Sequence, residues 1–399
     1  MMATWLDIVG IGEDGMAGLS PATRAVVEAA EVIVGGARHH SLSEAVTAQR
    51  IAWPSPFDAL IDTLKGLKGR RAVVLVTGDP LWYSVGARIL KGIPGEEITF
   101  HPQISAFQLG VCRMGWSLAD CETLTVHGRP VEQAVPFFAP GLRLLILTQG
   151  PETPGEIAAL LTEAGYGASR MSVLGAMGGP RETRRDGIAA SWEGEAPAFH
   201  LLAVECLAAE GARPRMPGIG LPDDAFEHDG KMTKRELRSL TVAALCPYRG
   251  QMLWDIGLGC GSVAIEWMRA ARDMGAVGLE PKAARRAMAA RNAARLGAPR
   301  LEIVDGTAPE GLTGLPAPDA VFIGGGLSEA VAEAALAALK PHGRLVANAV
   351  TLESEAVLAA LHARLGGDLR RIAVSRAEPV GPWRGWKSLM AVTQWVVQT

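Results

Sequence analysis

Short runs of apolar residues alternate with longer amphipathic stretches along most of the chain, a pattern typical of α/β proteins. In the first half, strands are expected at 5–11, 32–34, 71–77, 142–148, 171–175 and 200–205. Helices are expected from Pro21, with Ser20 as the N-cap, and over 154–164. This alternation of strand and helix predicts a mainly parallel sheet.

The second half repeats the alternation more regularly. A helix over 233–245 is expected to have Thr233 as its N-cap, with Glu236 completing a capping box. Strands are then expected at 252–256, 276–279, 301–304, 320–323 and 344–349, and helices at 262–271, 281–296, 327–339 and 353–365. Two β-rich runs, 369–375 and 388–397, are joined by a Pro/Gly/Trp loop and predict an antiparallel hairpin that closes the sheet.

Residues 208–231 interrupt this alternation, because proline and glycine are too dense there for the interior of a helix or strand. At 399 residues the chain is also too long for one ordinary hydrophobic core. We therefore expect a first domain over 1–207, a linker over 208–230 and a second domain over 231–399.

Composition narrows the classes of function. With 48% hydrophobic and 20% charged residues the chain can bury cores, and its net charge of −3 argues against a nucleic-acid partner. The five cysteines form no C-x-x-C pair and have no histidine at zinc spacing, so no metal site is expected. We recognise no signal peptide and no apolar run of about 18 residues, which predicts a cytoplasmic protein without a membrane partner.

The clearest chemical signal is a glycine-rich loop between an expected strand and an expected helix, at 255–261. Its three glycines allow a tight turn and let a ligand approach the backbone closely. Asp255 precedes them, and Glu280 ends the next strand 25 positions later, where a carboxylate can accept both hydroxyl hydrogens of a ribose. Residues 305–306 and 323–326 end two further strands, and open α/β sheets bind ligands at the carboxyl ends of their strands.

Two cofactors suit such a loop. A dinucleotide-binding domain would show G-x-G-x-x-G, whereas here the third glycine is misplaced and the acidic residue precedes the glycines. A methyl donor is therefore favoured over the nicotinamide cofactor of an oxidoreductase. A methyltransferase acting on RNA or protein remains an alternative that would need a basic groove, and a non-catalytic binding module is another.

Three runs in the second half, 230–238, 305–310 and 318–326, resemble the decarboxylating precorrin methyltransferase family of corrin biosynthesis. The resemblance implies a class I, Rossmann-like domain with a mixed seven-stranded sheet that binds S-adenosylmethionine. The residues expected at this cofactor are Thr233, Asp255, Gly257, Leu258, Gly259, Cys260, Gly261, Glu280, Asp305, Gly306 and Ala308. For Thr233 a plain helix cap is the alternative, and Cys260 is interpreted as a small space-filling side chain without a nucleophilic role.

The first half carries a second resemblance. A Gly-Ile-Gly loop at 10–12, a Gly-Asp-Pro turn at 78–80 and a Ser-Ala pair at 105–106 resemble the tetrapyrrole methylase family, and the runs 34–39 and 127–129 resemble its corrin branch. Each of these features alone would be an ordinary turn or loop. The resemblance implies a bilobal α/β domain with a second S-adenosylmethionine site lined by Ile11, Gly12, Gly78, Asp79, Ser105 and Ala106.

Together the two resemblances imply a bifunctional enzyme. The first domain would methylate carbon 5 of a tetrapyrrole, and the second would methylate carbon 15 and remove carbon dioxide from the acetate on carbon 12. No Ser/His/Asp triad is visible, so no catalytic residue is assigned. The resemblance also makes a homo-oligomer that packs through the second domain an expectation. Because the substrate carries many carboxylates, the candidates to bind it, each with a solvated surface charge as the alternative, are Arg129, Arg235, Arg238, Arg376, Arg384 and Lys387.

Overall fold

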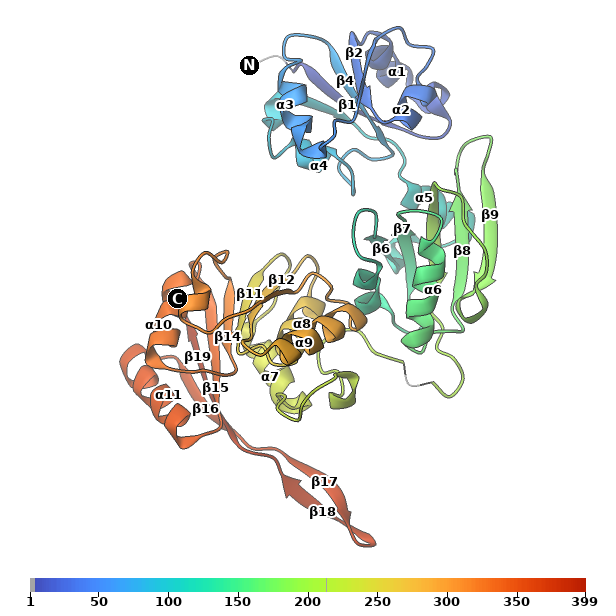
Figure 1. Ribbon diagram of the computed structural model, residues 1–399. Coiled ribbons are helices and arrows are strands. Elements are labelled where there is room, and N and C mark those ends of the chain that lie inside the picture. The colour runs from blue at the N-terminus through green and yellow to red at the C-terminus, as the bar shows by residue number, and fades with distance from the viewer. Residues whose placement is uncertain (1–3, 213) are drawn as a thin grey trace. The chain divides into compact units, whose positions relative to one another are not determined.

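The computed structural model describes residues 4–212 and 214–399, so residues 1–3 of the expected first domain and residue 213 of the expected linker lie outside the described residues. The chain forms two compact units. The N-terminal unit comprises Met1–Arg129 and Pro140–Ala212, and the C-terminal unit comprises Pro130–Ala139 and Arg213–Thr399. Both units are α/β structures, as the alternating pattern predicts (Figure 1).

The first sheet of the N-terminal unit has five parallel strands in the order β3-β2-β4-β1-β5. They are β1 (Leu6–Ile11), β2 (Val32–Gly35), β3 (Gln49–Ala52), β4 (Ala72–Thr77) and β5 (Ile98–His101). The helices around them are α1 (Pro21–Glu28), α2 (Ala37–Leu42), α3 (Leu60–Lys65) and α4 (Gly86–Ile89). Ser20 caps α1 as expected, because its hydroxyl accepts a hydrogen bond from Thr23 N. Apolar clusters cover both faces of this sheet, which explains the continuous apolar runs.

The second sheet of the N-terminal unit is mixed, in the order β6-β7-β10-β8-β9. Its strands are β6 (Cys121–Thr125), β7 (Arg143–Leu147), β8 (Arg170–Gly175), β9 (Thr183–Ile188) and β10 (His200–Glu205), and its helices are α5 (Ala106–Met114) and α6 (Thr153–Glu163). The expectation of a mainly parallel sheet holds for the first sheet and is wrong for this one. The exposed, polar strand β9 gives no apolar signal, and β10 runs antiparallel to both β7 and β8 because the segment between β9 and β10 returns the chain to the end of the sheet at which β9 began.

The C-terminal unit contains the mixed seven-stranded sheet expected from the sequence, in the order β13-β12-β11-β14-β15-β19-β16. Its strands are β11 (Met252–Ile256), β12 (Gly275–Leu279), β13 (Glu302–Val304), β14 (Ala320–Ile323), β15 (Arg344–Ala349), β16 (Asp368–Ile372) and β19 (Val392–Gln398). Its helices are α7 (Arg235–Leu245), α8 (Ser262–Ala270), α9 (Ala283–Arg295), α10 (Glu329–Ala338) and α11 (Leu352–Leu365). One apolar layer joins the sheet to α7, α8 and α9, and the other joins it to α10 and α11. The antiparallel pairs β15–β19 and β16–β19 confirm the predicted closure.

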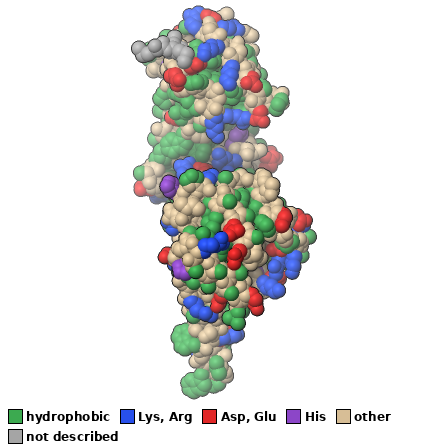
Figure 2. All heavy atoms as spheres, turned by 90° about the vertical axis from the view of Figure 1, so that its left-hand side faces the viewer, with side chains coloured by type: hydrophobic (Ala, Val, Ile, Leu, Met, Phe, Trp, Pro, Cys, Tyr) green, Lys and Arg blue, Asp and Glu red, His purple; other side chains and the backbone are tan. Residues whose placement is uncertain are grey.

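A two-stranded ribbon projects from this sheet where a loop was predicted. It consists of β17 (Ser375–Val380) and β18 (Trp383–Ser388), and we call it the arm. The expectation of a Pro/Gly/Trp loop was wrong because 375–380 and 383–388 pair in register across a tight turn despite their Pro and Gly content. Trp383 and Trp386 are 77% and 80% exposed, and hydrophobic side chains gather at the end of the arm (Figure 2).

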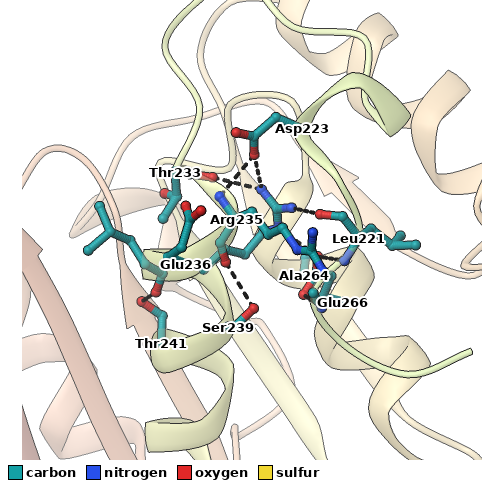
Figure 3. A network of polar contacts seen from close by, with 12 residues as sticks. Leu221, Asp223, Thr233, Arg235, Glu236, Ser239, Thr241, Ala264 and Glu266 are labelled. Carbon is teal, nitrogen blue, oxygen red and sulfur yellow. Dashed lines mark hydrogen bonds and ion pairs between the residues drawn. The ribbon is translucent and has the colours of Figure 1, made fainter. Parts of the chain in front are cut away.

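A buried ion-pair network attaches the segment before α7 to the body of the C-terminal unit (Figure 3). Arg238 of α7 is fully buried, and its Nε donates to Glu266 of α8 at 2.6 Å. Its other nitrogens donate to the carbonyl of Thr233 at 2.8 Å, to Asp223 at 3.2 Å and to the carbonyl of Leu221. Glu266 in turn accepts from the backbone amides of residues 220 and 221. Part of the expected linker is therefore packed structure, and Leu221 belongs to the core.

The network also corrects the predicted start of α7. Lys234, not Thr233, is the N-cap residue, and no side chain caps the helix from that position. Asp223 supplies the missing acceptor, because its Oδ1 lies 2.9 Å from the backbone nitrogen of Arg235. Glu236 does not close a capping box, since its carboxylate is bound by Arg376 of the arm at 2.6 Å. A side chain from outside the local sequence has replaced the local cap.

Replacing Arg238 with alanine should strongly destabilise the C-terminal unit, because it leaves Glu266 buried without its counter-charge. Breaking such a pair costs about 3–5 kcal/mol. The unfolding free energy can be measured on α7 and α8 by hydrogen exchange of the full chain in urea. Arg235→Ala, on the exposed side of the same helix, is the matched control and should cost no more than about 0.5 kcal/mol. Equal effects of the two substitutions would contradict the role of the network.

Candidate functional site

The glycine-rich loop of the C-terminal unit connects β11 to α8 at the carboxyl end of β11, an interior strand of the sheet. Gly257, Gly259 and Gly261 have φ angles of +80°, +59° and +82°, which side chains with a Cβ adopt at a cost. A Cβ on Gly257 would lie 2.8 Å from the backbone nitrogen of Gly325, which follows the neighbouring strand β14. Because Gly257 and Gly325 are both exposed, the loop presents bare backbone at the rim of the sheet.

Glu280 lies against this glycine turn, as its place at the end of the next strand predicts. Its Oε2 accepts from Gly259 N at 3.0 Å, and its Oε1 accepts from Lys282 N at 3.0 Å. The residue is only 3% exposed, and Arg285 Nη1 lies 4.0 Å from its Oε2. One buried carboxylate thus organises the backbone on both sides of it.

Asp255 is the second buried carboxylate of the loop. Its Oδ2 accepts from the backbone nitrogen of Ala264 in α8 at 3.1 Å, whereas its Oδ1 has no hydrogen-bond partner among the described residues. Burial raises the pKa of Asp255 to about 7, and the negative charge of Glu280 adds to this increase. A buried oxygen without a partner is costly unless a ligand or water satisfies it. Together with the glycine cradle, this oxygen fits a polar ligand bound at the loop.

The remaining expected residues of this site have mixed environments. Asp305 and Gly306 follow β13 beside Glu280, but the Asp305 side chain is largely exposed and pairs with Arg286 at 2.8 Å. Ala308 packs against the core. Cys260 is 5% exposed, and burial raises the pKa of its thiol, in keeping with a space-filling side chain. Thr233 contributes its carbonyl to Arg238.

The six basic residues expected at the substrate divide into two groups. The expectation was wrong for Arg238, which is fully buried and bound to Glu266 and Asp223, so it cannot reach a ligand in this structure. Arg376 also has a structural role, because it pairs with Asp223 and Glu236 and fastens the arm to α7. The others remain exposed, and they are Arg129, Arg235, Arg384 and Lys387, the last paired with Glu378.

In the N-terminal unit, three expected segments meet at the carboxyl end of the first sheet. A Cβ on Gly10 would lie 1.9 Å from the carbonyl oxygen of Gly78, so β1 and β4 approach closely just before Ile11 and Gly12. Gly78 has a φ of +64°, and a Cβ there would lie 3.0 Å from Ser105 Cα. The glycines therefore allow these segments to meet.

Two polar residues of this group also have local structural roles. Asp79 Oδ1 accepts from the backbone nitrogens of Leu81 and Trp82 at 2.7 and 3.0 Å, which fixes the turn after β4. Ser105 caps α5 and forms a capping box with Gln108, and Ala106 is the first residue of that helix.

A polar cluster lies at the same edge, and the sequence analysis did not predict it. The sequence analysis used the run 34–39 only for its family resemblance. Arg38 Nη1 donates to the hydroxyl of Thr77 at 2.8 Å, and Arg38 also pairs with Glu13. His39 Nε2 lies 3.1 Å from the same hydroxyl, and its Nδ1 lies 3.1 Å from Gly36 N. Burial, followed by the charge of Arg38, lowers the pKa of His39 to about 4. The sequence signal that could have indicated this cluster is the pair Arg38 and His39, which follows the strand at 32–34.

Residues 4–212 and 214–399 contain neither a metal-binding cluster nor a membrane-spanning helix. No cluster of three or more His, Cys, Asp or Glu side chains is placed to hold a metal ion. No helix in the same part of the chain has both the length and the apolar character needed to span a membrane.

Two family models match the chain, one in each half. Residues 6–190 match the tetrapyrrole (corrin/porphyrin) methylases, and residues 224–399 match a precorrin methyltransferase domain. Two relatives match less than half of the chain. They are a cobalt-precorrin-7 C(5)-methyltransferase of Salmonella typhimurium, 30% identical over 43% of this chain and 83% of its own, and a probable cobalt-precorrin-6B C(15)-methyltransferase (decarboxylating) of Pyrobaculum calidifontis, 39% identical over 41% and 87%.

A third relative matches the chain over nearly its whole length. It is a precorrin-6Y C(5,15)-methyltransferase (decarboxylating) of a Sinorhizobium species, and it is 45% identical over 99% of this chain and 96% of its own. Similarity of this extent covers the glycine loops of both units and every segment between them. The chain therefore belongs to the family of decarboxylating precorrin-6Y C(5,15)-methyltransferases.

Proposed function

We propose that this chain transfers methyl groups from S-adenosylmethionine to carbons 5 and 15 of a precorrin, and decarboxylates the acetate on carbon 12, in cobalamin biosynthesis. The observation that carries the proposal is the pair of buried carboxylates at the glycine turn, Asp255 and Glu280, in a chain that matches a C(5,15)-methyltransferase over nearly its full length. An oxidoreductase using a nicotinamide cofactor and a methyltransferase acting on RNA or protein lack comparable support.

Each unit would hold one molecule of the methyl donor, which supplies an electrophilic methyl group on sulfur. In the C-terminal unit, Glu280 would accept hydrogen bonds from the ribose, and the backbone of Gly257, Gly259 and Gly261 would lie along the ligand. The unsatisfied Oδ1 of Asp255 provides a further acceptor. In the N-terminal unit the residues proposed to contact the donor are Ile11, Gly12, Gly78, Asp79, Ser105 and Ala106, with Ile11 contributing its backbone because its side chain is fully buried.

We assign methylation of carbon 5 to the N-terminal domain, 1–207, and methylation of carbon 15 with decarboxylation to the C-terminal domain, 231–399. Two relatives support this division, because a C(5)-methyltransferase and a C(15)-methyltransferase exist as separate proteins that each match less than half of the chain. The models of the two families also match different halves.

The two methylations and the decarboxylation require mainly that the protein orient the donor and the tetrapyrrole. In each methylation a ring carbon forms a bond to the methyl carbon, the carbon–sulfur bond breaks, and the hydrogen of the ring carbon leaves as a proton. In the decarboxylation the bond to the carboxyl carbon breaks, carbon dioxide leaves and the remaining carbon takes up a proton. Aligning the two reactants and excluding water can lower such barriers by about 7–11 kcal/mol. The exposed Arg129, Arg235, Arg384 and Lys387 are candidates to bind substrate carboxylates.

The direct test incubates the full chain with a reduced precorrin-6 intermediate and donor that carries a ¹³C-methyl group. Mass spectrometry should show two methyl gains and one loss of carbon dioxide, and ¹³C NMR should place the label at carbons 5 and 15. Transfer of label to RNA or protein instead would contradict the proposal.

Glu280→Ala should selectively weaken donor binding in the C-terminal unit, because it removes the ribose acceptor and frees the Gly259 amide. We expect the dissociation constant of that site to rise at least about tenfold, as loss of a hydrogen bond to a charged group implies. Isothermal titration with S-adenosylhomocysteine should then detect one strong site in place of two, and the product should keep its label at carbon 5. Glu302→Ala, an exposed carboxylate on β13, is the control. Two unchanged sites in the Glu280 variant would rule out this role.

The stability of the ligand-free chain should depend on pH through Asp255. An acid whose pKa is raised on folding contributes stability that is complete below its ordinary pKa and is lost as the pH rises through the raised value. With a pKa raised to about 7, the unfolding free energy of wild type relative to Asp255→Asn should fall between about pH 4 and about pH 7. Urea denaturation at successive pH values measures this difference, and a difference that rises or stays level would contradict it.

We further propose that the protein is a homo-oligomer in which the arm contacts a second copy. The support is the exposure of Trp383 and Trp386 on a ribbon whose base is fixed to α7 by Arg376. Aromatic residues of this kind are enriched in interfaces.

Exchanging both tryptophans of the arm for serine should reduce the mass of the assembly in analytical ultracentrifugation, because it removes the apolar surface that we place between copies. Tyr248→Ser, which changes an exposed aromatic residue elsewhere in the same unit, should leave the mass unchanged. A wild-type protein that sediments as a monomer would disprove the proposal.

A further inference from the structure

Thr77 stands at the centre of the N-terminal edge described above. It is the last residue of β4, pairs in register with Ile11 of β1, and directly precedes Gly78. Two residues proposed to contact the methyl donor are therefore its neighbours, Gly78 along the chain and Ile11 on the adjacent strand. Its hydroxyl is approached by two side chains from the run 34–39, Arg38 and His39.

The direction of each hydrogen bond at this hydroxyl follows from the chemistry of its neighbours. A guanidinium can only donate, so Arg38 donates to Thr77 Oγ1 at 2.8 Å. The amide of Gly36 also can only donate, so His39 Nδ1 accepts and carries no hydrogen. Because the lowered pKa keeps His39 neutral near pH 7, the ring hydrogen is on Nε2, which donates to Thr77 at 3.1 Å.

Both lone pairs of the Thr77 oxygen are then occupied. A hydroxyl has two acceptor positions and one donor hydrogen, so Thr77 can take part in one further hydrogen bond only as a donor. Within the part of the chain that the structure describes, no hydrogen bond uses this hydrogen. Arg38 cannot turn away easily, because it is also paired with Glu13. The same pair neutralises the charge of Arg38 locally.

Resting on the proposed function, we infer that the Thr77 hydroxyl donates a hydrogen bond to the methyl donor bound in the N-terminal unit. Its partner there would be an acceptor oxygen or nitrogen of the ligand. Arg38 and His39 are positioning residues, which occupy the acceptor positions of the hydroxyl and so leave it one orientation. The site would thereby favour a ligand with a hydrogen-bond acceptor at that point and disfavour one with a hydrogen-bond donor there.

The first test addresses the arrangement without the ligand. Long-range ¹H–¹⁵N NMR of the histidine rings in the full chain, with His39→Gln to assign the signal, reports which ring nitrogen carries the hydrogen. We expect His39 to be protonated on Nε2 alone at pH 7. Protonation on Nδ1 would overturn the inference, because Thr77 would then have a lone pair available.

The second test removes the hydroxyl. In Thr77→Val the KM for donor in carbon 5 methylation should rise about three- to tenfold, which corresponds to the loss of one neutral hydrogen bond. Thr77→Ser should restore it, and Thr77→Ala provides a second variant should the valine protein not fold. Methylation of carbon 15 in the same reactions is an internal control, and Thr162→Val, which removes a hydroxyl that binds a carbonyl within α6, is the matched substitution.

The outcomes separate the two proposals. An unchanged KM for donor in Thr77→Val and Thr77→Ala would overturn the inference, and so would a rise confined to the KM for the tetrapyrrole, which would place the acceptor on the substrate. Absence of carbon 5 methylation by the wild-type chain would instead contradict the proposed function. In that case the Kd of S-adenosylhomocysteine for the N-terminal unit, measured in the Glu280→Ala background, decides the inference by the same fold-change.

Discussion

The hydrogen bond from the Gly259 amide to Glu280 ties the glycine turn to the neighbouring strand. The amides of Gly257 and Leu258 donate to the carbonyl of Leu279, so three hydrogen bonds hold the turn against the end of β12. The carboxylate is buried, so its bond is strong in its low-dielectric surroundings and costly to lose. The same contact keeps the charge of Glu280 close to Asp255, whose pKa it helps to raise.

The N-terminal unit solves a similar problem with different groups. Its strand ends are brought together by the close approach of Gly10 and Gly78, and its partly buried polar groups include the Thr77 hydroxyl, the neutral His39 imidazole and the Arg38 guanidinium paired with Glu13. The full-length relative is named as a methyltransferase of two carbons, 5 and 15. Two chemically distinct strand edges in this chain fit the two methylations proposed for it.

Sequence patterns predicted those parts of the fold that depend on local periodicity. Buried parallel strands were recognised because both their faces are apolar, and the glycine loop with its two acidic residues was recognised because only glycine suits its backbone angles. The partly exposed strands β3, β5, β6 and β9 and the pairing of the arm were missed, since they leave little hydrophobic signal. Thr233 and Arg238 were misjudged for another reason. Asp223, which accepts from the first amide of α7 in place of a Thr233 cap, and Glu266, which binds Arg238, come from segments whose proximity only the folded chain establishes.

The contacts of residues 220–223 with Glu266 and Arg238 determine where the chain can be divided into two halves. Gly220 and Leu221 donate their amides to Glu266, and Leu221 fills part of the core, so these residues belong to the C-terminal unit although they lie among prolines and glycines. A truncated second half that starts at 231 would expose Glu266 and deprive Arg238 of Asp223. A boundary between 208 and 219 keeps every one of these contacts, and expression of the two halves as independent proteins should respect it.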